Sequence, residues 1–323
     1  MTTGLYPRST SISTVINTES VHQIYVEASG NPHGIPVVFL HGGPGSSCNQ
    51  NHRRYFNPEH YYIIAFDQRG CGRSTPTGEL CNNTTQDLIH DIEAIRQHFN
   101  ITQWLIFGGS WGACLGLLYA QAFPHRVSGM ILRGCFLGRE QDLFWFAQQG
   151  ASALFPDAWQ AFIQDIPEAE QADLVKAFYQ RLHRGDHASQ LKYAGIWLDW
   201  SSKVATHNLS SGASARVPDD ALILKVRIET HYALHRYFID ENQILNNIDK
   251  LPKVPVTIIH GEFDRTCLLS ASQQLSASIA HSELIELANT GHLIEEKNMI
   301  DALVNSTDRY VEMLQYTAKT ATK

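Results

Sequence analysis

Trp104-Leu-Ile-Phe-Gly-Gly-Ser-Trp-Gly112 is the stretch that decides the fold of this 323-residue chain. Its four leading apolar residues have the length of a buried strand, and the apolar run 113–123 predicts a buried helix that stops before Pro124. The Gly108-Gly-Ser-Trp-Gly112 segment between them matches G-x-S-x-G, a strained strand-to-helix turn that exposes a serine hydroxyl. Glycines are needed there because a flanking Cβ would collide with the neighbouring strand or helix. The alternative is an ordinary corner with an incidental serine, but the context favours Ser110 as an activated nucleophile.

Two further segments supply the partners that a serine nucleophile needs. Gly261-Glu-Phe-Asp264 follows an apolar strand pattern, and Asn289-Thr-Gly-His292 follows the last one. Serine, then acid, then histidine is the chain order of hydrolases built on an open α/β sheet, which place their sites at the carboxyl ends of the strands. We expect His292 to take the serine proton and Asp264 to orient the imidazole. Glu262 is the nearest rival acid, but strand alternation points its side chain in a different direction.

A glycine-rich loop, His41-Gly-Gly-Pro-Gly45, directly follows the apolar strand that ends at Leu40. Acyl transfer passes through an oxyanion, which backbone N–H groups stabilise. The loop predicts an oxyanion hole made by the N–H groups of Gly43 and Trp111, the residue after the nucleophile. A plain glycine turn is the simpler alternative.

The first part of the chain alternates strand and helix patterns. Apolar or alternating strands are expected at 22–28, 36–40, 61–66, 104–107 and 127–132, with a helix at 84–99. Such alternation is typical of a mostly parallel sheet covered by helices on both faces.

The pattern changes after residue 133 and becomes aromatic-rich and helical until about 250, with a loop expected at 201–220. Strands at 255–260 and 284–287 and helices near 270–280 and 299–316 then complete the alternation. We therefore expect an α/β fold with a core formed by residues 1–133 and 251–323 and an inserted helical cap at 134–250.

Composition narrows the function classes. Hydrophobic residues make up 43% and charged residues 18% of the chain, as in soluble globular proteins. The formal net charge of −7 has no clustered basic run, so no nucleic-acid partner is expected. The chain shows neither a membrane-spanning run nor a secretory leader. The six cysteines are scattered, which favours free thiols in the cytoplasm, and the sixteen histidines form no metal motif, so no metal or cofactor is expected.

Several motifs together resemble one family. They are His41–Gly45, Asp67-Gln-Arg-Gly-Cys-Gly-Arg-Ser74, Gly108–Gly112, Arg133-Gly-Cys-Phe136, Trp145-Phe146, Gly150-Ala-Ser152, Leu154-Phe-Pro-Asp157 and Arg227-Ile-Glu-Thr-His-Tyr232. This set resembles the proline iminopeptidases (prolyl aminopeptidases) of the α/β-hydrolase fold and covers nearly the whole chain. The resemblance implies removal of an N-terminal proline from short peptides without metal or cofactor. We expect the Asp67–Ser74 segment to lock neighbouring loops through Asp–Arg pairs.

The resemblance also implies substrate-binding residues. Glu229 matches a family glutamate that holds the substrate amine, and Phe136 and Cys267 match positions that line the ring pocket. Without the motif, Glu229 would be interpreted as a surface carboxylate near Lys225.

Three residues depart from the family pattern. Ser201 stands where a second glutamate is usual, and Ala147 and Ala233 stand where aromatic residues are usual. Asp199 lies two residues from Ser201 and therefore points elsewhere on a helix. A wider pocket, less selective for proline, is expected.

Three functions remain open from the sequence. The first is a serine aminopeptidase acting on short peptides or small amides. The second is a carboxylesterase or amidase of broader specificity, which the three departures favour. A non-catalytic binding scaffold is the third, and an intact triad argues against it. Related folds with a carboxylate nucleophile are excluded by Ser110, and the sequence predicts no oligomeric state.

Overall fold

The computed structural model describes residues 4–206 and 218–321. Its centre is one eight-stranded sheet with the strand order β1-β2-β4-β3-β5-β6-β7-β8. The strands are β1 (Ser11–Asn17), β2 (Gln23–Gly30), β3 (Ile35–Leu40), β4 (Tyr61–Phe66), β5 (Trp104–Gly109), β6 (Val127–Arg133), β7 (Val256–Gly261) and β8 (Ser282–Leu287). From β4 to β8 all neighbours pair in parallel, while β1–β2 and β2–β4 are antiparallel. The predicted α/β architecture is confirmed.

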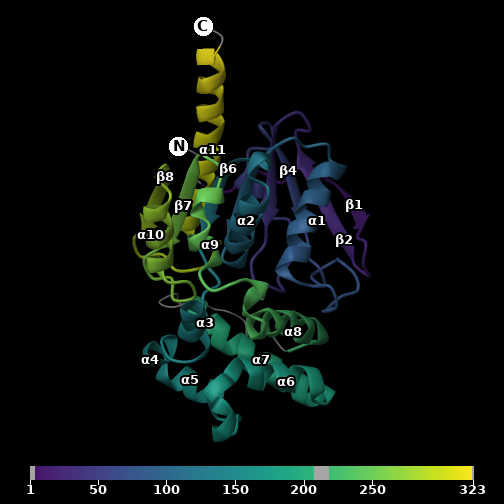
Figure 1. Cartoon of the computed structure of the whole chain (residues 1–323), viewed down its shortest axis with the longest axis vertical. Helices are drawn as coiled ribbons and strands as arrows, with labels where there is room; N and C mark the ends of the chain where they lie inside the picture. Colours follow the sequence, from purple (N-terminus) through teal and green to yellow (C-terminus); the bar gives the residue numbers. More distant parts are fainter. Residues whose placement is uncertain (1–3, 207–217, 322–323) are drawn as a thin grey trace.

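Helices cover both faces of this sheet (Figure 1). Ile106 of β5 belongs to the apolar cluster that includes α1 (Thr85–His98), α2 (Trp111–Ala122) and α10 (Leu269–Ser278). Its neighbours Leu105 and Phe107 belong to a second cluster, which includes α11 (Lys297–Ala321). Side chains of a strand alternate between faces, so a wholly apolar strand such as β5 is stable only when both faces are covered.

Between β6 and β7, the residues that the structure describes form helices and no strand. These helices are α3 (Glu140–Ala147), α4 (Ala151–Leu154), α5 (Pro156–Ile163), α6 (Leu174–Arg184), α7 (His187–Ala205), α8 (Asp220–Leu234) and α9 (Gln243–Asn246). We call α3 to α8 the cap helices, because they form a separate layer beyond one end of the strands (Figure 1). Short 3₁₀ turns connect several elements: His52–Tyr55, Pro124–Arg126, Glu168–Asp173, Arg236–Phe238 and Ile248–Lys250.

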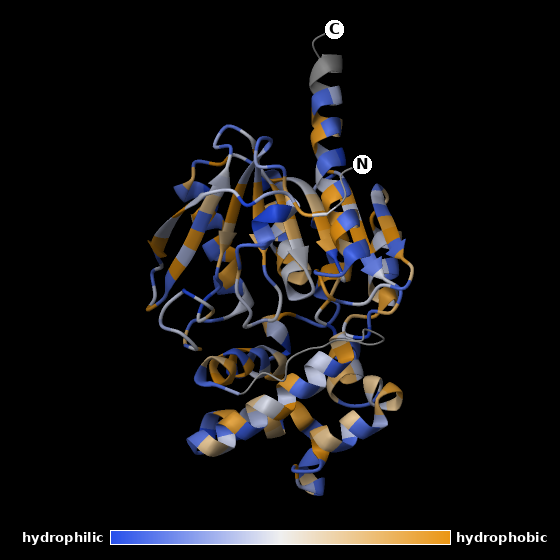
Figure 2. Ribbon diagram, turned by 180° about the vertical axis from the view of Figure 1, so that it is seen from behind, coloured by the Kyte–Doolittle hydropathy of each residue, from blue (hydrophilic) through white to orange (hydrophobic). Residues whose placement is uncertain are grey.

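The cap helices are held together by aromatic packing. Phe162 of α5 stacks on Phe178 of α6 with ring centroids 4.6 Å apart, and on Trp200 of α7 at 5.4 Å. Figure 2 shows hydrophobic and hydrophilic bands alternating along these helices, as expected for helices that bury one face. The apolar faces of the cap helices therefore pack on one another, and their residues are continuous with the apolar cluster on one face of the sheet.

Two expectations need correction. The loop expected at 201–220 begins later, because α7 continues to Ala205; positions 207–217 lie outside the described residues. The edge strand β1 was not predicted, and its mostly exposed side chains show why, since no continuous buried face marks it. Within residues 4–206 and 218–321, no helix combines the length and apolarity required to span a membrane.

Candidate active site

Ser110 stands at the junction between β5 and α2. Its backbone has φ 56° and ψ −123°, a conformation that side-chain-bearing residues rarely adopt. The turn is held because the Ser110 N–H donates to the Arg133 carbonyl at 2.9 Å, and its own carbonyl accepts from the Ala113 N–H at 3.0 Å. A Cβ on Gly108 would lie 2.4 Å from the Gly112 carbonyl oxygen, and one on Gly112 would lie 2.1 Å from that of Leu40. Both flanking glycines are therefore required by contact.

Asp264 and His292 meet beyond the ends of β7 and β8. The His292 Nδ1 lies 2.6 Å from the Asp264 Oδ2, while the N–H groups of Thr266 and Cys267 donate to the Oδ1, each at 2.9 Å. Burial of Asp264 alone would raise its pKa, but His292 and these hydrogen bonds outweigh it and hold the pKa of the carboxyl below its ordinary value. Asp264 is therefore ionised at neutral pH and fixes the orientation of the imidazole.

A second buried histidine lies beside the same carboxylate, with the His260 Nε2 3.5 Å from the Asp264 Oδ2. His260, at the end of β7, has its Nε2 2.9 Å from the Cys267 carbonyl and its Nδ1 2.7 Å from the Ser272 hydroxyl. Burial lowers the pKa of His260, which keeps it neutral. Sequence reasoning missed this residue, although its place four positions before Asp264 was a usable signal.

The loop after β3 lies beside the nucleophile. A Cβ on Gly42 would come within 3.6 Å of the Ser110 Cβ. Gly43 has φ +116°, a value that favours glycine. Trp111 begins α2, so its N–H has no acceptor inside the helix. Gly43 and Ser110 line the same cavity, and Trp111 directly follows Ser110, so both expected oxyanion donors belong to residues next to the nucleophile.

Gln68 connects this loop to α2. Its side-chain amide donates to the His41 carbonyl at 2.9 Å, and its side-chain oxygen accepts from the Trp111 indole N–H at 2.9 Å. The Gln68 backbone N–H also donates to the His41 Nε2 at 3.0 Å. All three residues are buried. Gln68 therefore fixes the glycine loop relative to the residue that follows the nucleophile.

The rest of the Asp67–Ser74 segment forms the expected ion pairs. Arg73 lies 2.8 Å from Asp67, and Arg69 contacts Asp91 of α1 through two hydrogen bonds of 2.7 and 2.8 Å. Asp67 also accepts from the Cys48 N–H at 2.7 Å. These contacts lock the loops after β3 and β4 together.

A cavity of about 400 Å³ opens above Ser110, between the sheet and the cap helices. It is lined by Ser110 and His292 and by all three predicted substrate-binding residues, Phe136, Cys267 and Glu229. The Cys267 sulfur lies 3.8 Å from the Ser110 hydroxyl oxygen, and Phe136 packs edge-on against Tyr237 with ring centroids 4.8 Å apart. The structure thus brings Glu229 of α8 together with residues from the segments that follow β5, β6, β7 and β8.

Glu229 faces this cavity from α8 but already has partners. The Trp197 indole N–H donates to one carboxylate oxygen at 2.8 Å, and the Lys225 ammonium lies 3.2 Å from the other. Glu229 is thus a cavity residue, as the family motif implies, and an ion-pair partner of Lys225, as its spacing implies.

The three departures from the family pattern lie in different places. Ser201 and Ala233 line the cavity that contains Ser110, whereas Ala147 does not; its neighbour Phe146 does. The expectation that Ala147 widens this pocket is therefore wrong, because adjacent residues on a helix point about 100° apart.

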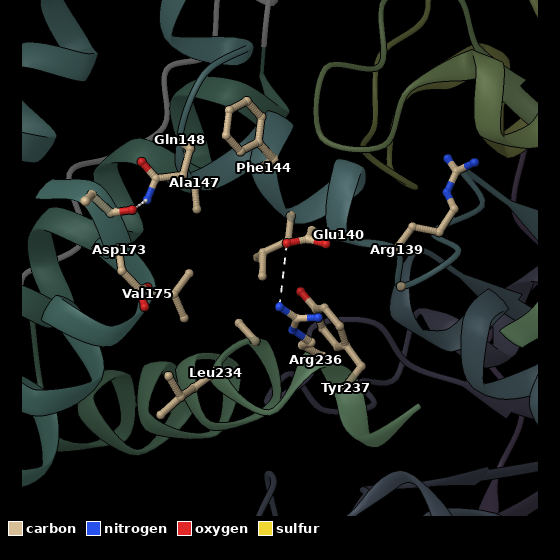
Figure 3. Close-up of a pocket in the computed structure, with 14 residues that line it drawn as sticks. Arg139, Glu140, Phe144, Ala147, Gln148, Asp173, Val175, Leu234, Arg236 and Tyr237 are labelled. Atoms are coloured by element: carbon tan, nitrogen blue, oxygen red, sulfur yellow. Dashed lines mark hydrogen bonds and ion pairs between the residues drawn. The ribbon is translucent and has the colours of Figure 1, made fainter. Parts of the chain in front are cut away.

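Ala147 instead lines a neighbouring cavity of about 390 Å³, together with Phe144, Gln148 and Leu234 (Figure 3). An ion pair between Arg236 and Glu140, 3.6 Å apart, lies beside it. The two cavities share three wall residues, Leu143, Ala233 and Tyr237.

Among the described residues, no group of three or more His, Cys, Asp or Glu side chains is arranged to hold a metal ion.

Comparisons with known proteins agree with this geometry. Residues 35–298 match the family model described as the alpha/beta hydrolase fold. A probable proline iminopeptidase of Leptolyngbya boryana is 42% identical over 301 residues, which cover 93% of this chain and 94% of that protein. The proline iminopeptidase of Xylella fastidiosa (strain 9a5c) is 43% identical over 311 residues, covering 95% of this chain and 99% of that protein.

The chain belongs to the proline iminopeptidase family. Among solved structures, an esterase from Exiguobacterium antarcticum superimposes with a TM-score of 0.60 at 23% identity, covering 95% of this chain and all (100%) of that one, which shows the shared fold alone. Several of the motifs that carry the resemblance contribute residues to the cavity at Ser110, among them Gly43, Phe136 and Glu229.

Proposed function

We propose that this protein is a serine aminopeptidase that releases an N-terminal proline, or another small residue, from short peptides. The observation that carries the proposal is one cavity that holds the strained Ser110, the Asp264-paired His292 and Glu229, in a chain 42% identical to a probable proline iminopeptidase.

The proposed reaction is acyl transfer through Ser110. His292 takes the hydroxyl proton as the Ser110 oxygen attacks the carbonyl carbon, and Asp264 stabilises the imidazolium that forms. The N–H groups of Gly43 and Trp111 stabilise the oxyanion. His292 returns the proton to the leaving amine as the C–N bond breaks. A water molecule, activated by the same imidazole, then hydrolyses the acyl-enzyme.

Substrate recognition is assigned to three residues that line the cavity around Ser110. Phe136 and Cys267 provide apolar surface for the proline ring, and Glu229 provides a carboxylate for the substrate amine. We further propose that residues 134–250 act as a helical cap on a core of 1–133 and 251–323. Such a cap closes one end of the cavity, so a peptide enters only by its N-terminus.

A second candidate is a carboxylesterase or amidase of broader specificity. It is favoured by Ser201 and Ala233, which line the cavity where the family usually has a glutamate and an aromatic residue. Loss of a charge-assisted partner for an ammonium weakens its binding by about 1.5–3 kcal/mol.

One substrate panel separates these candidates. We expect kcat/KM for prolyl-aminomethylcoumarin (prolyl-AMC) to exceed the values for N-acetyl-prolyl-AMC and p-nitrophenyl butyrate, with alanyl-AMC reporting tolerance of other small residues. Ser110→Ala serves as the blank and should reduce all activities by at least roughly a thousandfold while the protein stays folded. Residual activity within tenfold of wild type would remove Ser110 as nucleophile, and turnover of the ester alone would establish the esterase.

We also propose a cytoplasmic location and short-peptide or small-amide substrates, without nucleic-acid or membrane partners. All six cysteines are free thiols and five of them are buried, which suits a reducing compartment.

A further inference from the structure

The carboxylates that line the active-site cavity already have cationic partners. Among the described lining residues these carboxylates are Asp142 and Glu229. Asp142 receives two hydrogen bonds from the guanidinium of Arg139, at 2.6 and 3.0 Å, and Arg139 is only 3% exposed. The Asp142 carboxylate is therefore already neutralised by a buried ion pair with Arg139. Glu229 is left as the group able to meet a substrate ammonium, and its partner is Lys225.

Lys225 is placed to hold this partnership. It lies one helical turn before Glu229 on α8, and an ion pair at this i, i+4 spacing needs no distortion of the helix. Its backbone carbonyl lies against the glycine loop, since a Cβ on Gly45 would be 2.6 Å from that oxygen. The Lys225 side chain is 30% exposed and that of Glu229 15% exposed, and both line the cavity.

The pair has opposite consequences for two kinds of acyl group. A substrate with a free amine must displace the Lys225 ammonium from Glu229 or share the carboxylate with it. A neutral acyl group leaves the Lys225–Glu229 ion pair intact. If Lys225 were absent, binding of a neutral acyl group would bury the Glu229 carboxylate against apolar atoms with only the Trp197 hydrogen bond left, which is unfavourable.

We propose that Lys225 determines the substrate specificity of this site by holding Glu229 in place of the substrate ammonium, which admits acyl groups that lack a free amine. The proposal rests on the proposed serine hydrolase function and names the substrate class that the same cavity takes. Lys225 touches neither Ser110 nor the oxyanion donors in this role, so it affects binding rather than the chemical step.

The test compares two amides that differ at one position of the ring. Prolyl-AMC carries the ammonium, and cyclopentanecarbonyl-AMC has the same five-membered ring with carbon in place of nitrogen. In Lys225→Met, the ratio of their kcat/KM values should rise in favour of prolyl-AMC by at least about fivefold, mainly through KM. Lys225→Gln, which keeps a polar side chain without the charge, should shift the ratio in the same direction.

Two controls isolate the cause. Lys176→Met removes an exposed lysine of α6 that lies away from the cavity, and should leave the ratio unchanged. Combining Lys225→Met with Glu229→Gln should abolish the gain, because the gain depends on a freed carboxylate. Titration with a fluorophosphonate counts the active sites of each variant, so a loss of folded protein is not mistaken for a change in specificity.

A ratio that changes by less than fivefold in both Lys225 variants overturns the proposal, as does a gain that persists without Glu229. These outcomes leave turnover intact. Absence of turnover of both amides by the wild-type enzyme would instead contradict the proposed function itself.

Discussion

Replacing Gln68 by methionine tests whether this side chain holds the oxyanion loop. Methionine has nearly the same length, so the change removes the two side-chain hydrogen bonds and little volume. It leaves the His41 carbonyl and the Trp111 indole N–H buried without their partner, both at 2.9 Å in the native protein. Each such group costs about 1–3 kcal/mol, so the free energy of unfolding should fall by roughly 2–6 kcal/mol.

The kinetic effect should appear in kcat. Loss of the link to His41 lets the Gly43 N–H move away from the oxyanion, and removing one such donor costs about a hundredfold or more in kcat. Because the loop displacement is partial, we expect a decrease of about ten- to a hundredfold with KM little changed.

Urea unfolding at 25 °C, followed by tryptophan fluorescence, measures the first effect, and turnover of prolyl-AMC measures the second. Gln103→Met is the matched control, since the Gln103 side chain makes one exposed hydrogen bond to the His125 carbonyl, and should change stability by less than about 0.5 kcal/mol. A loss below about 1 kcal/mol together with a kcat within twofold of wild type would refute the argument that Gln68 holds the loop.

Three further outcomes are expected. Glu229→Gln should raise KM for prolyl-AMC about tenfold and leave KM for p-nitrophenyl butyrate nearly unchanged; equal effects on both would exclude Glu229 from amine recognition. Ser201→Glu places a carboxylate in the same cavity and should lower KM for prolyl-AMC, so an unchanged or higher KM would show that this position does not reach the amine. Burial first, and the charges of His41 and Arg133 next, lower the pKa of His52 from 6.5 to about 4. As pH falls, the imidazole of His52 is protonated in the unfolded chain before it is protonated in the folded protein. The free energy of unfolding should therefore decrease between about pH 6.5 and pH 4, by at most about 3 kcal/mol. His52→Phe, which keeps a ring stacked on Phe39 at the native 4.4 Å spacing, should flatten that part of the urea-unfolding profile, and an unchanged slope would assign the acid sensitivity to other groups.

What the sequence predicted well was local. Gly108 is required by a contact with Gly112, four residues on, and the G-x-S-x-G spacing is therefore visible in one short stretch of sequence; the contact that requires Gly112 is with the more distant Leu40. The meeting of Asp264 and His292 followed from a general property of parallel sheets, whose strand ends share one edge.

What it predicted poorly depends on how distant elements meet. Gln68 joins His41 to Trp111 only because β3, β4 and β5 lie next to one another. Whether Phe146 or Ala147 faces the active-site cavity depends on how α3 is rotated about its own axis. The apolar periodicity of the sequence predicts that rotation only to within about one residue. The spacing of Lys225 and Glu229 was visible, but the side of α8 that faces Ser110 was not.

The wall shared by the two cavities limits the size of the acyl group that fits beside Ser110. Leu143, Ala233 and Tyr237 line both the space of about 400 Å³ beside the nucleophile and the neighbouring one of about 390 Å³. A smaller residue at Leu143 is expected to remove part of this shared wall and to enlarge the room beside Ser110 without altering the triad. One substitution in this shared wall is thus a short evolutionary step from a preference for small acyl groups to a preference for bulky ones.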